Sequence, residues 1–75
     1  MTDIAAPVVA SVWKLLVQVE DEVEAGATVA VLESMKMEIP LHAPTGGRVV
    51  AVPVSEGQIV QEGDAIVVLG DVSAN

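Results

Sequence analysis

Residues 49–57 have the sequence VVAVPVSEG, an apolar run interrupted by Pro53 and Gly57. Proline removes a backbone donor and clashes with the preceding helical turn, and glycine weakens a helix interior, so this run is not helical. The chain carries sixteen Val and four Ile, whose stiff branched side chains suit the pleated surface of a strand. We therefore predict a strand here, and the same structure for a second part of the chain that resembles it.

The sequence repeats itself at a spacing of 37 residues. Residues 6–33 align with residues 43–70 without a gap, and several unlike pairs, such as Trp13 with Val50 and Val29 with Ile66, still set one apolar residue against another. The identical pairs are Ala6/Ala43, Pro7/Pro44, Val12/Val49, Val17/Val54, Val23/Val60, Gly26/Gly63, Val31/Val68 and Leu32/Leu69. Two such halves predict one all-β domain over residues 1–75, with its core at about 4–70 and an approximate two-fold axis between the halves.

The repeat resolves an ambiguity in the first half. Apolar residues between Val12 and Val23 recur with the spacing of an amphipathic helix. Because the matching stretch contains Pro53, neither half is expected to be helical there. The predicted strands are residues 4–10, 12–18, 28–33, 37–42, 47–54 and 65–70, with shorter extended pieces around Val23 and Val60.

Turns and core positions follow from the same alignment. Residues 24–27 and 62–64 are predicted to form equivalent turns, in which glycine supplies the permissive backbone. Trp13, the only aromatic residue, falls opposite Val50 in the repeat, so we expect it to pack in the core. Val31 is also expected in the core, where its replacement by alanine would open a cavity.

The two-fold axis also predicts where the middle of the chain lies. A shift of 37 residues carries position 36 to position 73 in one direction and to a point just before Met1 in the other. The axis therefore relates the segment around Lys36 to the two termini. We expect Lys36 and the termini to lie at opposite ends of the molecule.

Composition and charge argue against several classes of function. The 75 residues include three Lys and Arg against eleven Asp and Glu, a net charge of −8, which disfavours nucleic acids and anionic membrane surfaces as partners. No apolar run approaches the roughly 20 residues of a membrane span. The residues after Met1 lack the basic start and apolar stretch of a signal peptide, so we expect a cytoplasmic protein. Without cysteine there is no thiolate metal site.

The connection between the apolar stretches 29–32 and 39–41 breaks the local rules for a hairpin. It consists of Glu33, Ser34, Met35, Lys36, Met37 and Glu38. A two-residue hairpin turn needs positive φ, which Gly, Asn and Asp tolerate and which Met and Lys disfavour. Such violations tend to mark function. The residues alone are equally compatible with a solvated surface lysine whose neighbours, Met35 and Met37, fold back as flexible gap fillers.

The sequence resembles the biotinyl domains of biotin-dependent carboxylases. The matching motifs are these six residues, Ala43-Pro44-x-Gly46 and Gly63-Asp64. The sequence is most similar to the free-standing form of these domains, a small single-domain biotin attachment protein, and the resemblance extends from about Val8 to Gly70. It implies a flattened barrel-sandwich hybrid of two four-stranded antiparallel sheets, with Lys36 on an exposed hairpin opposite the termini. Related lipoyl domains usually carry Asp-Lys-Ala where this chain has Met-Lys-Met.

Two positions depart from the family pattern. Ser34 stands where alanine is more usual, and its small side chain should be tolerated. Glu20-Asp21 stands where Gly-Asp is more usual, whereas the second half has Gly57-Gln58. The turn at Glu20 is therefore expected to differ a little from its counterpart. The gapless repeat leaves no room for the protruding insertion that some family members have in their first half.

The resemblance implies a carrier, with no catalytic residue and no metal of its own, that is a monomer when isolated. In the family a biotin protein ligase uses ATP to make biotinyl-AMP, and the lysine amine, here that of Lys36, attacks it and forms an amide. A biotin carboxylase then carboxylates the attached biotin, and a carboxyltransferase passes the carboxyl group to an acyl-CoA or a keto acid. The residues that flank the attachment site are Glu33, Ser34, Met35, Met37 and Glu38.

Two alternatives to a biotin carrier remain. A lipoyl carrier shares the fold, although the methionines on both sides of Lys36 argue against it, and a small interaction module would need no cofactor. A stand-alone enzyme is the weakest interpretation, because the sequence offers no nucleophile with an adjacent base. His42, the only histidine, is interpreted as a strand or loop residue near the hairpin. Lys14 and the acidic run 20–24 are interpreted as solvated surface.

Overall fold

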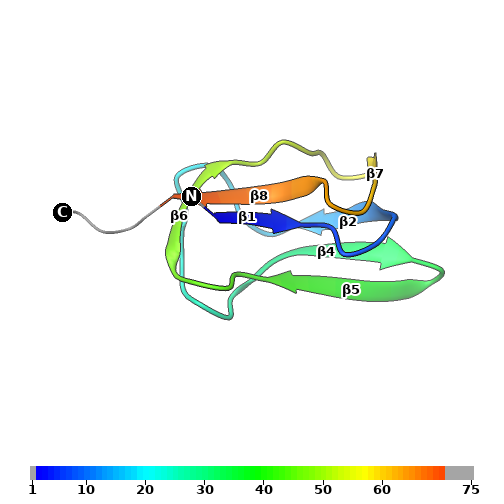
Figure 1. Cartoon of the computed structure of the whole chain (residues 1–75), viewed down its shortest axis with the longest axis horizontal. Coiled ribbons are helices and arrows are strands. Elements are labelled where there is room, and N and C mark those ends of the chain that lie inside the picture. Colours follow the sequence, from blue (N-terminus) through cyan, green and yellow to red (C-terminus); the bar gives the residue numbers. More distant parts are fainter. Residues whose placement is uncertain (1, 71–75) are drawn as a thin grey trace.

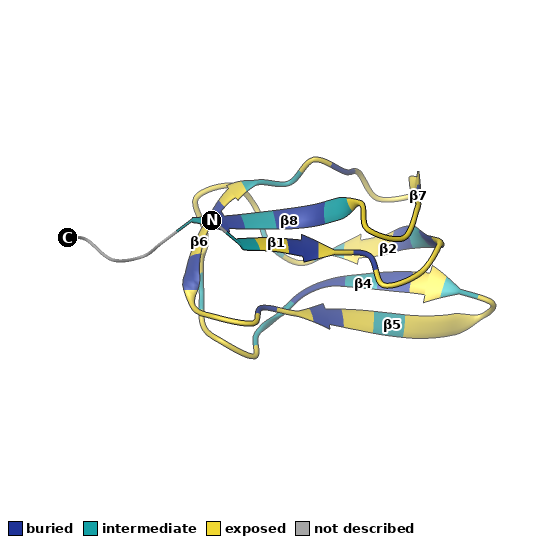
Figure 2. Ribbon diagram, in the orientation of Figure 1, coloured by how far each residue is buried: buried dark blue, intermediate teal, exposed yellow. Residues whose placement is uncertain are grey.

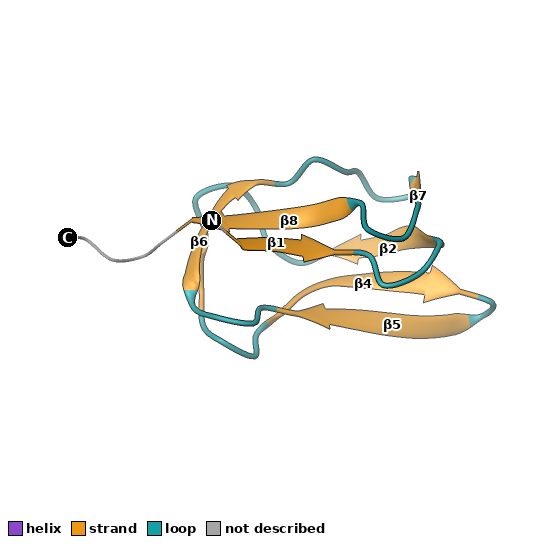
Figure 3. Ribbon diagram, in the orientation of Figure 1, coloured by secondary structure: helices purple, strands orange, loops and turns teal. Residues whose placement is uncertain are grey.

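The computed structural model of the chain describes residues 2–70, and the regular elements in that range are strands (Figures 1 and 3). They are β1 (Thr2–Ala5), β2 (Ala10–Leu15), β3 (Glu22–Val23), β4 (Thr28–Ser34), β5 (Met37–His42), β6 (Gly47–Ala51), β7 (Ile59–Val60) and β8 (Ala65–Gly70). No membrane-spanning helix occurs among these residues. The helical spacing in the first half therefore belongs to a strand and the loop that follows it, as the repeat predicted.

The strands form two antiparallel four-stranded sheets that face each other as a flattened barrel (Figure 1). One sheet has the order β1-β8-β6-β3, and the other has the order β5-β4-β2-β7. A shift of 37 residues carries β2, β3 and β4 onto β6, β7 and β8, and carries β1 onto the later part of β5. The two orders are thus equivalent under the two-fold axis. The fold class predicted from the sequence is confirmed.

The core lies between the inner faces of the two sheets (Figure 2). Successive residues of a strand point to opposite faces, so alternate apolar side chains of both halves meet there. The buried apolar residues are Ile4, Ala6, Ala10, Val12, Val29, Ala30, Leu32, Leu41, Ala43, Val49, Val54, Val60, Ile66, Val67 and Leu69. A domain this small buries a modest share of its surface, so its stability depends on these few aliphatic side chains together.

Two glycine turns repeat the same hydrogen bond on both sides of the axis. The N–H of Gly26 donates to the carbonyl of Ala43, and the N–H of Gly63 donates to the carbonyl of Ala6, each at 2.8 Å. Their φ angles are 89° and 92°, in a region that residues with a Cβ rarely adopt. Both predicted turns are therefore confirmed.

The turn at Glu20 has the same backbone as the turn at Gly57. The N–H of Glu20 donates to the carbonyl of Val49, and the N–H of Gly57 donates to the carbonyl of Val12, each at 2.7 Å. φ is 82° at Glu20 and 90° at Gly57, so a glutamate occupies a glycine conformation. The prediction that the two turns differ is wrong. The hydrogen bonds across the barrel hold the backbone in this conformation even though glutamate disfavours a positive φ.

Replacing Glu20 with glycine is therefore expected to stabilise the protein. A side chain in this region costs about 1–2 kcal/mol, and the freer unfolded chain of a glycine variant offsets about 0.4–1 kcal/mol of the gain. The net gain should raise the melting temperature in a thermal scan by a few degrees. The reciprocal variant Gly57→Glu should lower it. An equal or lower melting temperature for Glu20→Gly would contradict the strain at this turn.

The predicted strand 4–10 is wrong, because β1 and β2 are separate strands. Pro7 has no N–H to contribute to a ladder. The backbone of Ala6 bonds to a turn instead, where its N–H donates to the carbonyl of Asp64 and its carbonyl accepts from Gly63. Between β1 and β2 the chain therefore passes from one sheet to the other.

The predicted strands 12–18 and 47–54 are longer than β2 and β6. At the end of β2, the N–H of Leu15 donates to a carboxylate oxygen of Glu56 at 2.9 Å, so a side chain takes the place of a neighbouring strand. The chain leaves β6 before Pro53, which cannot donate to a ladder. The remaining long strands predicted from the sequence agree with β4, β5 and β8 to within one residue.

Trp13 faces solvent, with 46% of its surface exposed, so its predicted place in the core is wrong. The register of β2 shifts between Val12 and Lys14, which places a bulge at Trp13. Val12 keeps the inward position, and Lys14 lies opposite Val31. The Lys14 ammonium is 5.6 Å from the centre of the Trp13 ring, a cation–π distance. Val31 is only half-buried, so its predicted core position is also wrong.

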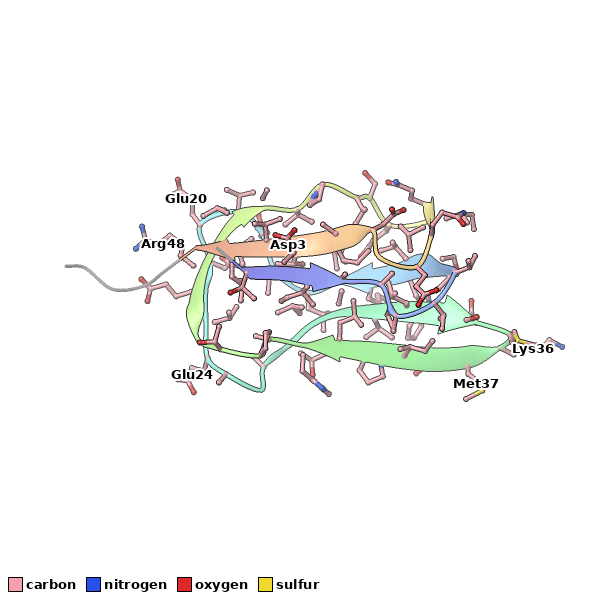
Figure 4. The ribbon with its side chains drawn as sticks, viewed as in Figure 1. Asp3, Glu20, Glu24, Lys36, Met37 and Arg48 are labelled. Carbon is pink, nitrogen blue, oxygen red and sulfur yellow. The ribbon has the colours of Figure 1, made fainter. Side chains whose placement is uncertain are left out.

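The barrel is elongated along the direction of its strands (Figure 1). At one end β1 begins and β8 ends, and Lys36 lies at the other end (Figures 1 and 4). The predicted separation of Lys36 from the termini is confirmed for the described residues. Met1 and residues 71–75 lie outside them.

Candidate functional site

The hairpin of β4 and β5 positions the six residues that the sequence analysis singled out. β4 is a central strand, with β2 on one side and β5 on the other, and its Leu32 is completely buried. The ladder closes with Ser34 opposite Met37, so Met35 and Lys36 alone form the turn. The tip therefore projects from a strand that is fixed along its length by two neighbours and by the core.

The backbone of this turn has the conformation that its residues disfavour. φ is 53° at Met35 and 67° at Lys36. Positive φ at both central positions matches the twist of the flanking strands, and Asn-Gly is the usual sequence for it. Each non-glycine residue held there costs about 1–2 kcal/mol. The tight turn predicted from the sequence is confirmed, and its residues serve something other than the stability of the hairpin.

The side chains at the tip project into solvent. Met35 is 92% exposed and Met37 is 66% exposed, so neither folds back onto the barrel as a gap filler. Figure 4 shows the amine of Lys36 pointing away from the barrel along its long axis. Among residues 2–70 the one ion pair joins Arg48 to Glu22, so no described carboxylate holds the Lys36 ammonium. The amine is free to move and to be approached.

Glu33 and Glu38 face each other across the hairpin, one residue beyond Ser34 and Met37 on each strand. Both glutamates are exposed. Like charges directly opposite each other destabilise a strand pair slightly, so this arrangement also serves something other than folding. Both glutamates were predicted as flanks of the attachment site but not as a pair, and their equal distance from the turn is the feature of the sequence that indicates the pairing. They place negative charge on both sides of Lys36.

The other candidate residues lie away from this tip. Lys14 sits on the outer face of β2 against the ring of Trp13. His42 ends β5 opposite Thr28, at the end of the hairpin far from the turn, so it is a strand residue, as expected. The acidic side chains from Glu20 to Glu24 are exposed, as expected. Within residues 2–70 no group of His, Asp and Glu is placed to hold a metal ion.

Sequence comparison relates the chain to biotin-carrying proteins. Residues 1–69 match the biotin/lipoyl family, described as biotin-requiring enzyme. A biotin/lipoyl attachment protein of Bacillus subtilis (strain 168) is 46% identical over 61 residues, which are 81% of this chain and 84% of that one. A biotinylated protein of Mycobacterium leprae (strain TN), the TB7.3 homolog, is 45% identical over 67 residues, which are 89% of this chain and 94% of that one.

Two further similarities extend to carboxylases. The biotin carboxyl carrier protein of acetyl-CoA carboxylase from Solanum lycopersicum is 40% identical over 68 residues, which are 91% of this chain and 97% of that one. The crystal structure of the Kluyveromyces lactis urea carboxylase matches 92% of this chain with a TM-score of 0.85 and 30% identity, and the chain spans 6% of that protein. A family match over residues 1–69, with relatives of this identity and coverage, shows that the chain belongs to the biotin/lipoyl family of biotin-requiring proteins.

Proposed function

We propose that the chain is a biotin carboxyl carrier and that Lys36 is the residue to which biotin is attached. The observation that carries the proposal is the tip of the β4–β5 hairpin. There a lysine with no described ion pair stands in a strained turn, between two methionines that are 92% and 66% exposed. Membership of the family and the biotin-carrying relatives support the same function.

The chemistry of attachment fits this residue. In an enzyme that activates the biotin carboxyl group as biotinyl-AMP, the neutral amine of Lys36 attacks the carbonyl carbon, AMP leaves, and the amine loses a proton as the amide forms. The group that accepts the proton has to come from the ligase, because the described part of the chain places no carboxylate within ion-pair distance of the amine. When attached, biotin supplies a ureido ring that accepts and releases a carboxyl group.

The geometry suits a shuttle between two active sites. The hairpin is anchored by β4 in the core, whereas the side chain of Lys36 extends beyond the barrel (Figure 4). A flexible stem on a rigid support can reach a biotin carboxylase and a carboxyltransferase in turn without unfolding the carrier. We propose these enzymes and a biotin protein ligase as partners of a monomeric, non-catalytic cytoplasmic domain that comprises residues 1–75.

Lipoate is the second candidate group, because the Bacillus subtilis relative is named for biotin or lipoyl attachment. Two observations favour biotin. The Mycobacterium leprae relative is named as biotinylated, and this chain keeps a methionine on each side of Lys36. An interaction module without a cofactor has less support, because nothing in such a role explains the strain retained at the tip.

The test is the intact mass of the purified protein after incubation with a biotin protein ligase, ATP and biotin. The expected result is a gain of one biotinyl group, located on Lys36 rather than on Lys14 by peptide mapping. A parallel incubation with a lipoate ligase, ATP and lipoate should give no gain. A folded protein that accepts lipoate and no biotin would replace the biotin proposal by the lipoyl one, and a protein that accepts neither would overturn both.

A further inference from the structure

Met35 and Met37 are the most exposed of the large apolar side chains at the tip, at 92% and 66%. The chain contains no cysteine, so thioethers are its most readily oxidised side chains. The third methionine, Met1, lies outside the described residues. Oxidation in the described part of the chain is thus directed to the two residues that adjoin Lys36.

The exposed position of these methionines means that oxidation does not disturb the fold. Neither residue belongs to the buried core, and the ladder of the hairpin closes through backbone pairing between Ser34 and Met37. A sulfoxide oxygen at either position remains in water in the free protein. The modified protein is therefore folded and differs from the parent only on the surface around Lys36.

We propose that the tip is a site of reversible methionine oxidation, and that a sulfoxide at Met35 or Met37 slows the attachment of biotin to Lys36. This inference rests on the proposed function. An enzyme that draws the Lys36 amine into its active site covers both neighbours, since they precede and follow the lysine directly. Covering a thioether removes apolar surface from water, whereas covering a sulfoxide strips water from a polar oxygen that has no partner prepared for it.

The oxidant that we invoke is a peroxide. The sulfur lone pair attacks one peroxide oxygen, the O–O bond breaks, an S–O bond forms, and the other oxygen leaves as water after proton transfer when the oxidant is hydrogen peroxide. The sulfur loses two electrons and the peroxide gains them. Methionine sulfoxide reductases reverse the change, one enzyme for each sulfoxide epimer, at the expense of two thiols that form a disulfide.

The experiment compares the parent with Met35→Leu/Met37→Leu, which keeps apolar side chains and lacks the sulfur atoms. Each protein is treated with hydrogen peroxide, its sulfoxides are counted and located by mass spectrometry, and its kcat/KM for biotinylation is divided by that of its own untreated sample. We expect the ratio for the parent to fall about tenfold, the equivalent of about 1.4 kcal/mol, and to recover after treatment with both reductases and dithiothreitol. The ratio for the double variant should stay at one.

Trp13 fluorescence, compared before and after oxidation, shows that the fold is intact in each sample. A fully oxidised parent that is biotinylated as fast as the untreated one would overturn the inference and leave the proposed function standing. An equal loss in the double variant would also overturn it, because the oxidised group would then lie elsewhere. An untreated parent that accepts no biotin would overturn the proposed function and this inference together.

Discussion

Replacing Lys36 with arginine is expected to reduce biotin attachment to background and to leave the folded state unchanged. Arginine keeps the positive charge and the length of the side chain, but its guanidinium is always protonated and supplies no nucleophilic amine. The side chain of Lys36 is exposed and points away from the barrel (Figure 4), and such surface changes usually alter stability by less than about 0.5 kcal/mol. The measurements are the intact mass after the ligase reaction and the melting temperature.

The control for this variant is Lys14→Arg, which changes the only other lysine of the chain. It should retain full biotin attachment, because Lys14 lies on the outer face of β2 against Trp13 and arginine preserves that cation–π contact. Attachment that persists in Lys36→Arg and disappears in Lys14→Arg would reverse the assignment. Unfolding of Lys36→Arg would show that the hairpin depends on the lysine for its structure.

Replacing Leu32 with alanine should bring the domain close to unfolding at room temperature. Leu32 is completely buried on the central strand β4, and truncating such a side chain costs about 2–5 kcal/mol through lost burial and the cavity left behind. A domain of this length has a total stability of about 4–11 kcal/mol. A urea titration followed by Trp13 fluorescence would measure the loss, and biotin attachment should fall as the folded fraction falls.

Val31→Ala is the matched control, one position away on the same strand. Val31 is half-buried and points to the outer face, so its truncation should cost less than about 1 kcal/mol. The difference between the two variants tests the alternation of β4 directly. Equal losses for Val31→Ala and Leu32→Ala would mean that the outer face of this sheet is as tightly packed as the core.

The all-β class could be predicted from two linked signals in the sequence, whereas the barrel of two four-stranded sheets was implied by the family resemblance. Pro53 excluded a helix, and the 37-residue repeat carried that exclusion to the first half. The same repeat located the glycine turns and the separation of Lys36 from the chain ends. These features depend on the backbone preferences of proline and glycine and on the spacing of the repeat, and both can be read from a single sequence.

The details that the sequence did not reveal depend on contacts between distant residues. Trp13 was placed in the core because it falls opposite the apolar Val50 in the repeat, but both residues lie where the strand register shifts and both are exposed. Glu20 adopts a glycine backbone because the carbonyl of Val49 lies across the barrel to receive its N–H. Each of these depends on register, which local propensity does not determine.

The adjacency of β1 and β8 has a mechanical consequence. The two strands are antiparallel neighbours, with Thr2 opposite Leu69, so a force that separates the ends of the domain loads their ladder one pair at a time, as a zipper opens. β1 is an edge strand and would peel away first. Tension of this kind would leave the β4–β5 hairpin unloaded, because it belongs to the other sheet. The lysine arm would thus keep its support while the opposite end of the barrel yields.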